Sequence, residues 1–288
     1  MVTFESGKQV NEVRDFLAYW NLRERPFEAT WDTRFYFQSN DHEEALSRLT
    51  FLVTEQTMNM GMLTGEIGCG KTLTRAVFVE SLDPRHYEVV VQESPVFRFT
   101  DLLAPILQKL DPKGEGETKF LRWERLRRAT EKLHADGRHL VLIFDEAQEM
   151  APATLNELKL LTNLNGGGQN YLTIILLGQP ELRVLVAKLP AIDQRISLRY
   201  HLGFLDAEGC QGYVRHRLRA AGHASGELFS SESIEQAHQA SKGIPRELNR
   251  LAKLSLEFAW LREMPTVPVH AVETVVRDLN RHQQLYAA

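Results

Sequence analysis

The chain has 288 residues, of which 43% are hydrophobic and 25% charged, a balance that suits one large globular domain and a smaller one. Its net charge of −4, from 34 basic and 38 acidic residues, excludes a general attraction to nucleic acid or anionic membranes, although local basic patches can still exist. Two cysteines, Cys69 and Cys210, do not make a disulfide framework. Because no apolar run nears the roughly 18 residues of a spanning helix and no signal-peptide pattern opens the chain, we expect a cytoplasmic protein without a transmembrane segment.

Short apolar runs alternate with amphipathic stretches up to about residue 205, a pattern typical of a parallel sheet wrapped by helices. The strands predicted along this part of the chain are Met60–Thr64, Tyr87–Gln92, Leu140–Phe144, Tyr171–Leu177 and Ile196–Leu202. The helices predicted beside them are Asp41–Gln56, Thr72–Glu80, Thr100–Leu110, Lys119–Asp136, Pro152–Leu164 and Pro180–Leu189. The predicted fold class is therefore α/β, with a five-stranded parallel sheet and flanking helices.

Beyond residue 205 no strand pattern appears. The helices predicted there are Ala207–Ala221, Ser231–Ser241, Pro245–Arg262 and His270–Gln284. We therefore expect an N-terminal segment at residues 1–38, an α/β core at 39–205 and a small helical lid at 206–288.

The strongest motif is Gly-Glu-Ile-Gly-Cys-Gly-Lys-Thr at Gly65–Thr72, which fits the phosphate-binding pattern Gly-x4-Gly-Lys-Ser/Thr in full. Its glycines let successive backbone N–H groups face phosphate oxygens, and the following helix adds its positive end. Lys71 supplies a cation for the γ-phosphate, while the Thr72 hydroxyl can ligate Mg²⁺. The residues expected to contact a nucleotide are Gly65, Glu66, Ile67, Gly68, Cys69, Gly70, Lys71, Thr72 and Leu73. Cys69 is interpreted as a small residue at a permissive position.

Two carboxylates, Asp145 and Glu146, follow the apolar strand Leu140–Phe144. Ligands of open parallel sheets lie outside the carboxyl ends of the strands, which predicts that Asp145 lies beside the phosphate loop and holds Mg²⁺ or its water. Glu146 is then placed to orient and polarise the attacking water.

Three further polar residues extend this site. Gln179 follows the fourth strand and would lie between Asp145 and the γ-phosphate if that strand neighbours the phosphate-loop strand. Arg195, before the fifth strand, could reach the nucleotide of a neighbouring subunit, and Arg199 is a poorer candidate because it lies further into the strand. Arg246 opens a lid helix and could report whether ATP is present.

Taken together, these motifs resemble those of the AAA+ ATPases, and more narrowly of their ExeA-type branch, over about residues 16–280. The segments that carry the narrower resemblance are Tyr19–Leu22, Arg25–Phe27, Arg34–Phe37, Leu63–Glu66, Leu176–Leu182 and Gly243–Leu251. The resemblance gives Lys71 and Thr72 the Walker A roles, Asp145 and Glu146 the Walker B roles, and makes Gln179 sensor 1, Arg195 the finger and Arg246 sensor 2.

Members of that branch serve in type II secretion and MSHA-type pilus assembly, and transposition ATPases of the TniB/MuB type are relatives. The resemblance implies a homo-oligomeric ring or filament that uses ATP and Mg²⁺ and remodels a protein partner of such machinery. The membrane segment and cell-wall-binding tail of the longer secretion members are expected to be absent. The stretch Asp145–Met150, followed by Leu155–Leu158, also resembles the transposition relatives.

An alternative is an ATP-dependent regulator that binds duplex DNA as an oligomer through Lys119–Arg138. The basic residues of that surface are Lys119, Arg122, Arg125, Arg127, Arg128, Lys132 and Arg138, with Trp123 available for stacking. A nucleotide-gated switch with negligible turnover is a third hypothesis, which the presence of both carboxylates disfavours. The sequence lacks an Asn-Lys-x-Asp motif for guanine, which favours ATP, and the adenine is expected near Phe27.

Overall fold

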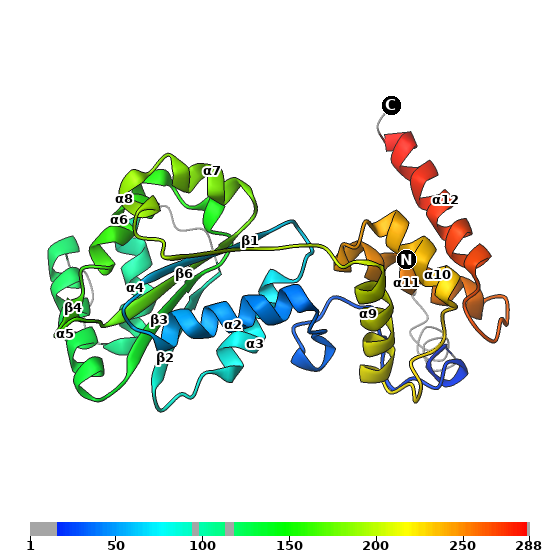
Figure 1. The fold of residues 1–288 in the computed structure, drawn as a ribbon, viewed down its shortest axis with the longest axis horizontal. Coiled ribbons are helices and arrows are strands. Elements are labelled where there is room, and N and C mark those ends of the chain that lie inside the picture. Colours follow the sequence, from blue (N-terminus) through cyan, green and yellow to red (C-terminus); the bar gives the residue numbers. More distant parts are fainter. Residues whose placement is uncertain (1–15, 94–97, 113–117, 287–288) are drawn as a thin grey trace, which may run out of the picture. The chain divides into compact units, whose positions relative to one another are not determined.

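The computed structural model describes residues 16–93, 98–112 and 118–286. The chain divides into two compact units (Figure 1). One, the α/β unit, comprises Asn40–Ile67 and Lys71–Gly203. The other, the helical unit, comprises residues 16–39, the short piece Gly68–Gly70 and the described chain from Phe204 to Tyr286.

The α/β unit is built on a five-stranded sheet in the order β2-β3-β6-β1-β7, and all its neighbouring strands run parallel. Its strands are β1 (Met60–Gly65), β2 (Tyr87–Gln92), β3 (His139–Phe144), β6 (Leu172–Gly178) and β7 (Leu198–Leu202). Every residue of β1, β3 and β6 is buried, as expected for central strands covered on both faces. The sequence-based prediction of a five-stranded parallel sheet is confirmed, with strand bounds that differ by at most two residues.

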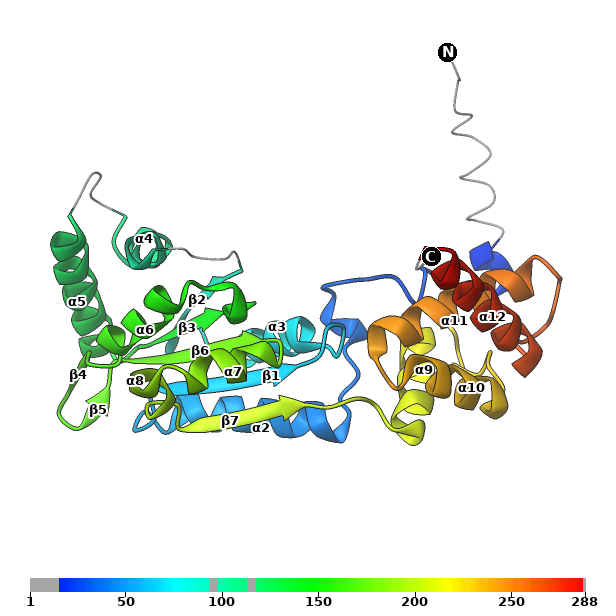
Figure 2. The same cartoon turned by 90° about the horizontal axis from the view of Figure 1, so that it is seen from above.

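Helices cover both faces of this sheet (Figures 1 and 2). Helices α2 (Asn40–Thr54) and α3 (Lys71–Ser81) lie side by side on one face, against β1 and β7. The other face carries α4 (Phe99–Leu110), α5 (Lys119–Ala135), α6 (Pro152–Leu161), α7 (Glu181–Ala187) and α8 (Pro190–Asp193).

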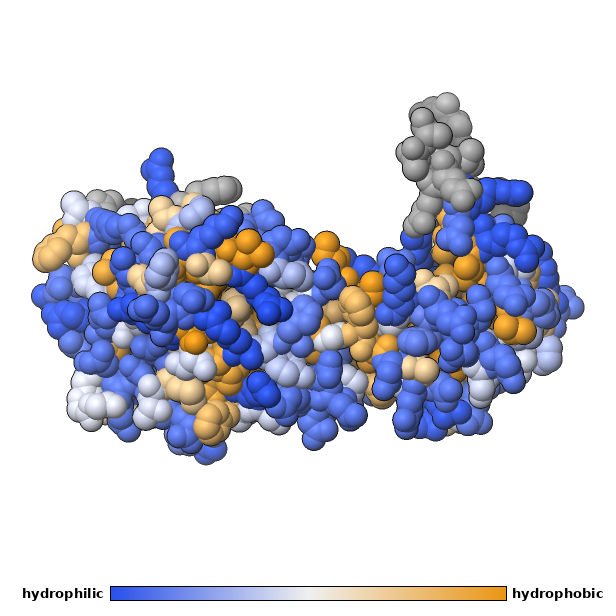
Figure 3. All heavy atoms as spheres, turned by 45° about the horizontal axis from the view of Figure 1, so that its top comes forward, coloured by the Kyte–Doolittle hydropathy of each residue, from blue (hydrophilic) through white to orange (hydrophobic). Residues whose placement is uncertain are grey.

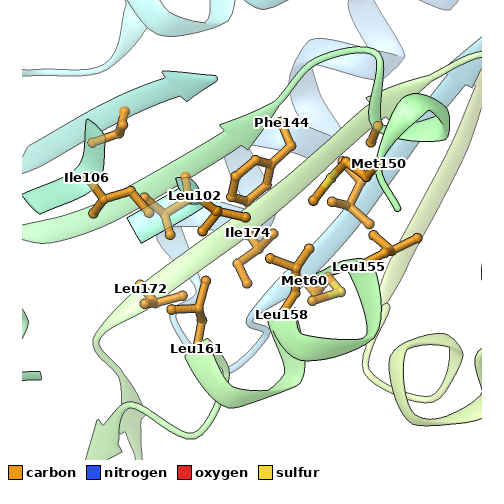
Figure 4. Packing of buried hydrophobic residues seen from close by; sticks show 14 of the residues in the cluster. Met60, Leu102, Ile106, Phe144, Met150, Leu155, Leu158, Leu161, Leu172 and Ile174 are labelled. Carbon is orange, nitrogen blue, oxygen red and sulfur yellow. The ribbon is translucent and has the colours of Figure 1, made fainter. Parts of the chain in front are cut away.

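The larger core lies between the sheet and this second helical layer (Figure 4). Met60, Phe144 and Ile174 project from three neighbouring strands toward the helices, where they meet residues such as Leu102 of α4 and Leu158 of α6. Alternate residues of a strand point to opposite faces, so one residue in two of each strand joins this core. The packed layers fix where each strand ends, and thereby position the residues that follow.

Three local features differ from the sequence-based expectation. The helix predicted at Pro152–Leu164 ends earlier, because α6 stops at Leu161 and Thr162 caps it. The helix expected at Pro180–Leu189 is shorter, because α7 ends at Ala187 and the separate helix α8 starts at Pro190, a residue suited to a first helical position. A small antiparallel hairpin, β4 (Asn165–Gly166) with β5 (Gln169–Asn170), precedes β6. Its turn residues Gly167 and Gly168 both have positive φ, of 61° and 84°, which glycine adopts readily.

The helical unit contains α9 (Ala207–Ala220), α10 (Ser231–Ser241), α11 (Pro245–Trp260) and α12 (Val269–Tyr286). Part of the N-terminal segment packs on it: Trp20, Phe27 and Phe35 are buried in its core, the last at the end of the 3-10 helix η1 (Thr33–Phe35). The buried Arg217 of α9 donates hydrogen bonds to the carbonyls of Pro26 and Glu28, both at 2.6 Å. These bonds satisfy backbone groups that the loop itself leaves unpaired. Residues 1–15 of the predicted N-terminal segment lie outside the described residues.

Within the described ranges, no helix has both the length and the apolar character needed to cross a membrane.

Candidate functional site

The phosphate-loop motif connects β1 to α3. Gly68 and Gly70 have φ angles of 83° and 106°, which explains why glycine is needed at both positions. The ammonium of Lys71, 6% exposed, donates to the carbonyls of Gly65 (2.7 Å) and Glu66 (3.0 Å) and is thereby held over the start of the loop. The loop therefore combines tightly curled backbone with a cation at the N-terminus of α3, an arrangement suited to phosphate.

The remaining loop residues differ in exposure. Ile67 is exposed, whereas Cys69 is buried. Thr72 and Leu73 occupy the first turn of α3 and are partly buried. Residues Gly68–Gly70 belong to the helical unit. Within that unit, the carbonyl of Gly68 accepts a hydrogen bond from the Arg246 N–H at 3.2 Å.

Asp145 leaves the end of β3 with only 7% of its surface exposed. One of its oxygens lies 3.5 Å from a guanidinium nitrogen of Arg75 on α3, and the same guanidinium bonds Glu93 at 2.6 Å. Burial raises the pKa of Asp145, while the charges of Arg75 and Lys71 lower it. The carboxylate, which follows β3, and the loop lysine, which follows β1, are thus close enough to interact electrostatically.

Glu146 adopts a left-handed backbone conformation with φ of 49°, and its N–H donates a hydrogen bond to Asp145 Oδ1 at 3.0 Å. Its Oε2 accepts two hydrogen bonds, from Gln148 Nε2 at 2.7 Å and from Gln179 Nε2 at 3.3 Å. The carbonyl oxygen of Gln148 in turn accepts the backbone N–H of Gln179 at 3.0 Å. Glu146 is therefore fixed by residues from the ends of two strands.

Strand order explains this meeting. Since β6 lies between β1 and β3, the residue that follows β6 lies between the phosphate loop and the acidic pair. The sequence analysis placed Gln179 between Asp145 and the γ-phosphate on the condition that its strand neighbours the phosphate-loop strand. Strands β6 and β1 are neighbours, so this condition is met. Gln148, in the 3-10 helix η2 (Ala147–Glu149), was missed by the sequence analysis. Its one available signal was its place in the run Asp-Glu-Ala-Gln, two residues after Glu146.

Arg195 lies away from these groups. Its guanidinium donates to Thr162 Oγ1 (3.1 Å) and to the carbonyl of Ala191 (2.7 Å), and nearby Ser197 N–H bonds the carbonyl of Met60. Met60 begins β1, whereas the phosphate loop follows its end, so Arg195 lies at the opposite edge of the sheet. Arg199 forms an exposed ion pair with Asp193 at 2.8 Å.

Arg246 is the second residue of α11 in the helical unit, directly after Pro245 at the first helical position, and its side chain is exposed. The turn before it is tightly packed: a Cβ on Gly243, whose φ is 73°, would lie 2.0 Å from the carbonyl oxygen of Leu205. Glycine is required there, and the turn fixes where the helix starts. Phe27, where adenine was expected, is buried in this unit's core and packs edge-to-face on Phe229 at 6.0 Å.

The donor set at the sheet edge fits a magnesium ion. Thr72 offers a hydroxyl and Asp145 a buried carboxylate, both hard oxygen ligands. Over the described ranges no three His, Cys, Asp or Glu side chains gather as a metal cage. Such a sparse set suits Mg²⁺, which is usually held by one or two protein groups together with substrate phosphates.

Comparisons with known proteins show what this chain is similar to. Residues 54–186 match the family model described as "AAA domain". The chain is 32% identical over 250 residues to the General secretion pathway protein A of Aeromonas hydrophila, covering 86% of this chain. It spans less than half of that relative, 45% of its length.

Solved structures share the fold. The ORC2 protein of Aeropyrum pernix, in ADPNP and ADP complexes, has a TM-score of 0.64 at 16% identity, covering 88% of this chain and 71% of that one. The ORC1 protein of Aeropyrum pernix in complex with DNA has a TM-score of 0.62 at 15% identity, covering 86% and 67%.

Proposed function

We propose that this chain is an AAA+ ATPase of the ExeA type, which binds ATP·Mg²⁺ through Gly65–Leu73 and hydrolyses it with Glu146 as the base. The observation that supports this most is the meeting of Lys71, Asp145, Glu146 and Gln179 at one edge of the sheet. These are the charges and hydrogen-bonding groups that phosphoryl transfer to water needs.

In the proposed reaction, a water oxygen attacks the γ-phosphorus while Glu146 takes the water's proton. The bond from the γ-phosphorus to the bridging oxygen breaks, and ADP leaves. Lys71 stabilises the γ-phosphate oxygens, and Gln179 hydrogen-bonds the water or the phosphate. Bound Mg²⁺, held by Thr72 and Asp145, would neutralise phosphate charge.

Two variants test this assignment. Lys71→Ala should lose nucleotide binding, since it removes the loop's cation. Glu146→Gln should keep ATP binding but release phosphate about 10²- to 10⁴-fold more slowly, because it removes the base. Both are measured by titration of a fluorescent ATP analogue and by steady-state phosphate release.

Glu149→Gln is the matched control: the same change, three residues further on, at an exposed side chain of η2. It should behave like the parent. Parent-like binding and turnover in Lys71→Ala would contradict the proposal, as would parent-like turnover in Glu146→Gln. ATP binding with no phosphate release from the parent would instead support the nucleotide-gated switch.

We further propose that hydrolysis occurs at interfaces between copies of this chain and drives remodelling of a protein partner, with Arg195 acting on the neighbour's nucleotide and Arg246 sensing the γ-phosphate. The likeness to General secretion pathway protein A supports a partner in secretion machinery. The position of Arg195 at the far edge of its own sheet supports an action on a neighbour rather than on its own nucleotide.

Duplex DNA binding is the second candidate, supported by two exposed basic side chains on α5, Arg128 and Lys132, one helical turn apart. Most of the other basic groups on this surface are occupied. Arg125, Arg127, Lys119 and Arg138 pair with acidic side chains, and Arg122 bonds the carbonyl of Thr100. Trp123 packs toward the core beside Phe99. These contacts favour protein remodelling over DNA binding.

A further inference from the structure

The side chain of Gln148 occupies an unusual place, between the end of β3 and the end of β6. Its amide nitrogen donates to Glu146 Oε2 at 2.7 Å, and its amide oxygen accepts the backbone N–H of Gln179 at 3.0 Å. Both ends of one amide are thus engaged, one by the proposed base and the other by the strand end that carries Gln179.

The chemistry of the two partners fixes which way this amide points. The backbone N–H of Gln179 can only donate, so it selects the carbonyl oxygen of Gln148. The NH₂ group must then face Glu146, where an ionised carboxylate can only accept. A glutamine satisfies both requirements, whereas a carboxylate of the same shape would satisfy only the first.

Glycine at the end of β6 makes this approach geometrically feasible. A Cβ on Gly178 would lie 2.6 Å from the amide oxygen of Gln148 and 2.9 Å from Leu182 Cδ2. Real Cβ atoms do not come so close to other heavy atoms. A Cβ at residue 178 could not move away from Gln148 either, because it would then press on the Leu182 side chain. The absence of a side chain at residue 178 therefore lets Gln148 reach the β6 end.

The same contacts restrict Glu146. Its backbone is held in a left-handed conformation with its N–H on Asp145, and its Oε2 is held by Gln148 and Gln179. Among the described residues, none hydrogen-bonds Oε1 of Glu146. Fixing one carboxylate oxygen sets the direction of the other, which is the oxygen left to meet a water molecule.

We propose that Gln148 is a positioning residue for hydrolysis: it orients the carboxylate of Glu146 and couples it to Gln179, so that a shift at the β6 end also moves the base. This inference rests on the proposed function, in which Glu146 is the base and Gln179 the γ-phosphate sensor. Gln148 itself touches neither water nor nucleotide in this scheme, and acts through the two residues that do.

The decisive variant is Gln148→Glu, which keeps the shape and the acceptor for Gln179 but replaces the donor with a charge that repels Glu146. We expect kcat to fall about 10- to 100-fold, as loss of a hydrogen bond to a charged group implies, with KM and the ATP dissociation constant within twofold of the parent. Gln148→His, whose neutral ring carries one donor and one acceptor, should recover part of the loss. Gly178→Ala should reproduce the loss without changing any side-chain chemistry near the nucleotide.

The coupling is tested by adding Gln148→Ala to Glu146→Gln. If Gln148 acts through Glu146, the second change should lower kcat no further, although alone it lowers kcat about 10-fold or more. The matched control is Gln239→Glu in α10, where a glutamine also donates to a glutamate, Glu235, at 3.1 Å on an exposed surface. Melting temperatures of all variants show whether each one folds.

The outcomes separate this inference from the proposed function. A folded Gln148→Glu protein with unchanged or faster turnover would overturn the role of Gln148. An inactive Glu146→Gln protein would still support the assignment of Glu146 as the base. A further drop in kcat in the Glu146/Gln148 double variant would overturn the positioning of Glu146 by Gln148, because it would show that Gln148 acts by a route other than Glu146. A parent protein that neither binds nor cleaves ATP would instead refute the proposed function.

Discussion

At the scale of single residues, His139 shows how burial at a strand start makes stability depend on pH. The ring is 1% exposed, and its Nε2 is 2.8 Å from Thr173 Oγ1, while its Nδ1 has no hydrogen-bond partner in the part of the chain that is described. Burial, and to a lesser degree the charge of His134, lowers the pKa of His139 from its usual 6.5 to about 4. The native protein therefore holds this ring neutral.

Acidification should weaken the fold through His139. As the pH falls below about 6.5, the unfolded chain protonates this ring but the folded chain does not until about pH 4. The stabilisation from neutral His139 is thus complete above pH 6.5 and is lost between there and pH 4, amounting to roughly 3 kcal/mol at 1.36 kcal/mol per pKa unit. Urea unfolding of His139→Asn across this range should show a flatter pH dependence than the parent.

His86→Asn is the control, because His86 is a largely exposed ring at the start of the neighbouring strand β2. It should leave the slope of stability against pH close to that of the parent. An identical slope in the parent and in His139→Asn would contradict the assignment of this pH dependence to His139.

The proposed catalytic groups were predictable to different degrees at this scale. Lys71 and Asp145 could be identified because their residue types follow apolar strands at fixed spacing. Gln148 could not, since its importance arises from a contact with Gln179, 31 residues away in the chain. The left-handed backbone of Glu146 was likewise hidden, because glutamate carries no local preference for positive φ.

At the scale of elements, the strands that are buried on both faces were the easiest to predict. The predicted bounds of β1, β3 and β6 differ from the observed ones by no more than one residue at either end, because continuous apolar runs mark them clearly. The β4–β5 hairpin was missed, since its strands are two polar residues long and are defined by pairing rather than by pattern. Sequence periodicity thus finds elements that contribute to a core and misses those that do not.

Helix α5 carries the prediction about DNA. Of its basic residues, only the exposed Arg128 and Lys132 lack a side-chain ion pair or backbone bond among the described residues of that surface. Two phosphate contacts would give a slope of only about −2 in a plot of log affinity against log salt. We therefore expect no retention on duplex DNA at moderate salt with either ATP or ADP, measured by filter binding.

The double variant Arg128→Ala/Lys132→Ala provides the control for this test. ATP-dependent retention by the parent that disappears in the double variant would contradict the expectation and support the DNA-binding alternative.

The face in Figure 3 is largely hydrophilic, with apolar residues in small groups, so surface hydropathy alone does not identify a partner site.

At the scale of the whole molecule, the N-terminal segment joins the helical unit. Arg217 bonds two of its carbonyls, and Trp20 and Phe27 add to the unit's core. The sequence gives no sign of this, because an arginine in an amphipathic helix normally faces solvent and the aromatic residues lie outside any periodic pattern. Contacts between segments nearly 200 residues apart are a property of the folded chain.

Arg195 carries the prediction about assembly. It lies at the edge of the sheet where β1 begins, whereas the phosphate loop follows the end of β1, about five residues or roughly 16 Å along the strand. It therefore cannot serve its own site, but a neighbouring copy could receive it. Arg195→Ala should lower turnover by about 10³-fold as a lost arginine finger, with ATP binding nearly intact. Turnover per subunit of the parent should rise with protein concentration.

Mixing two inactive variants distinguishes a finger from a structural residue, which matters because Arg195 also bonds Thr162 and Ala191 within its own subunit. A Glu146→Gln subunit retains Arg195, and an Arg195→Ala subunit retains Glu146, so an interface that pairs them correctly holds a complete site. We expect the mixture to regain phosphate release well above either variant alone. Arg199→Ala, which removes an exposed ion pair with Asp193 and a hydrogen bond to the Asp193 carbonyl, should match the parent throughout. Two results together would contradict the finger role: no recovery on mixing, and a lowered melting temperature of Arg195→Ala. They would show that Arg195 stabilises its own subunit and does not act on the nucleotide of a neighbour.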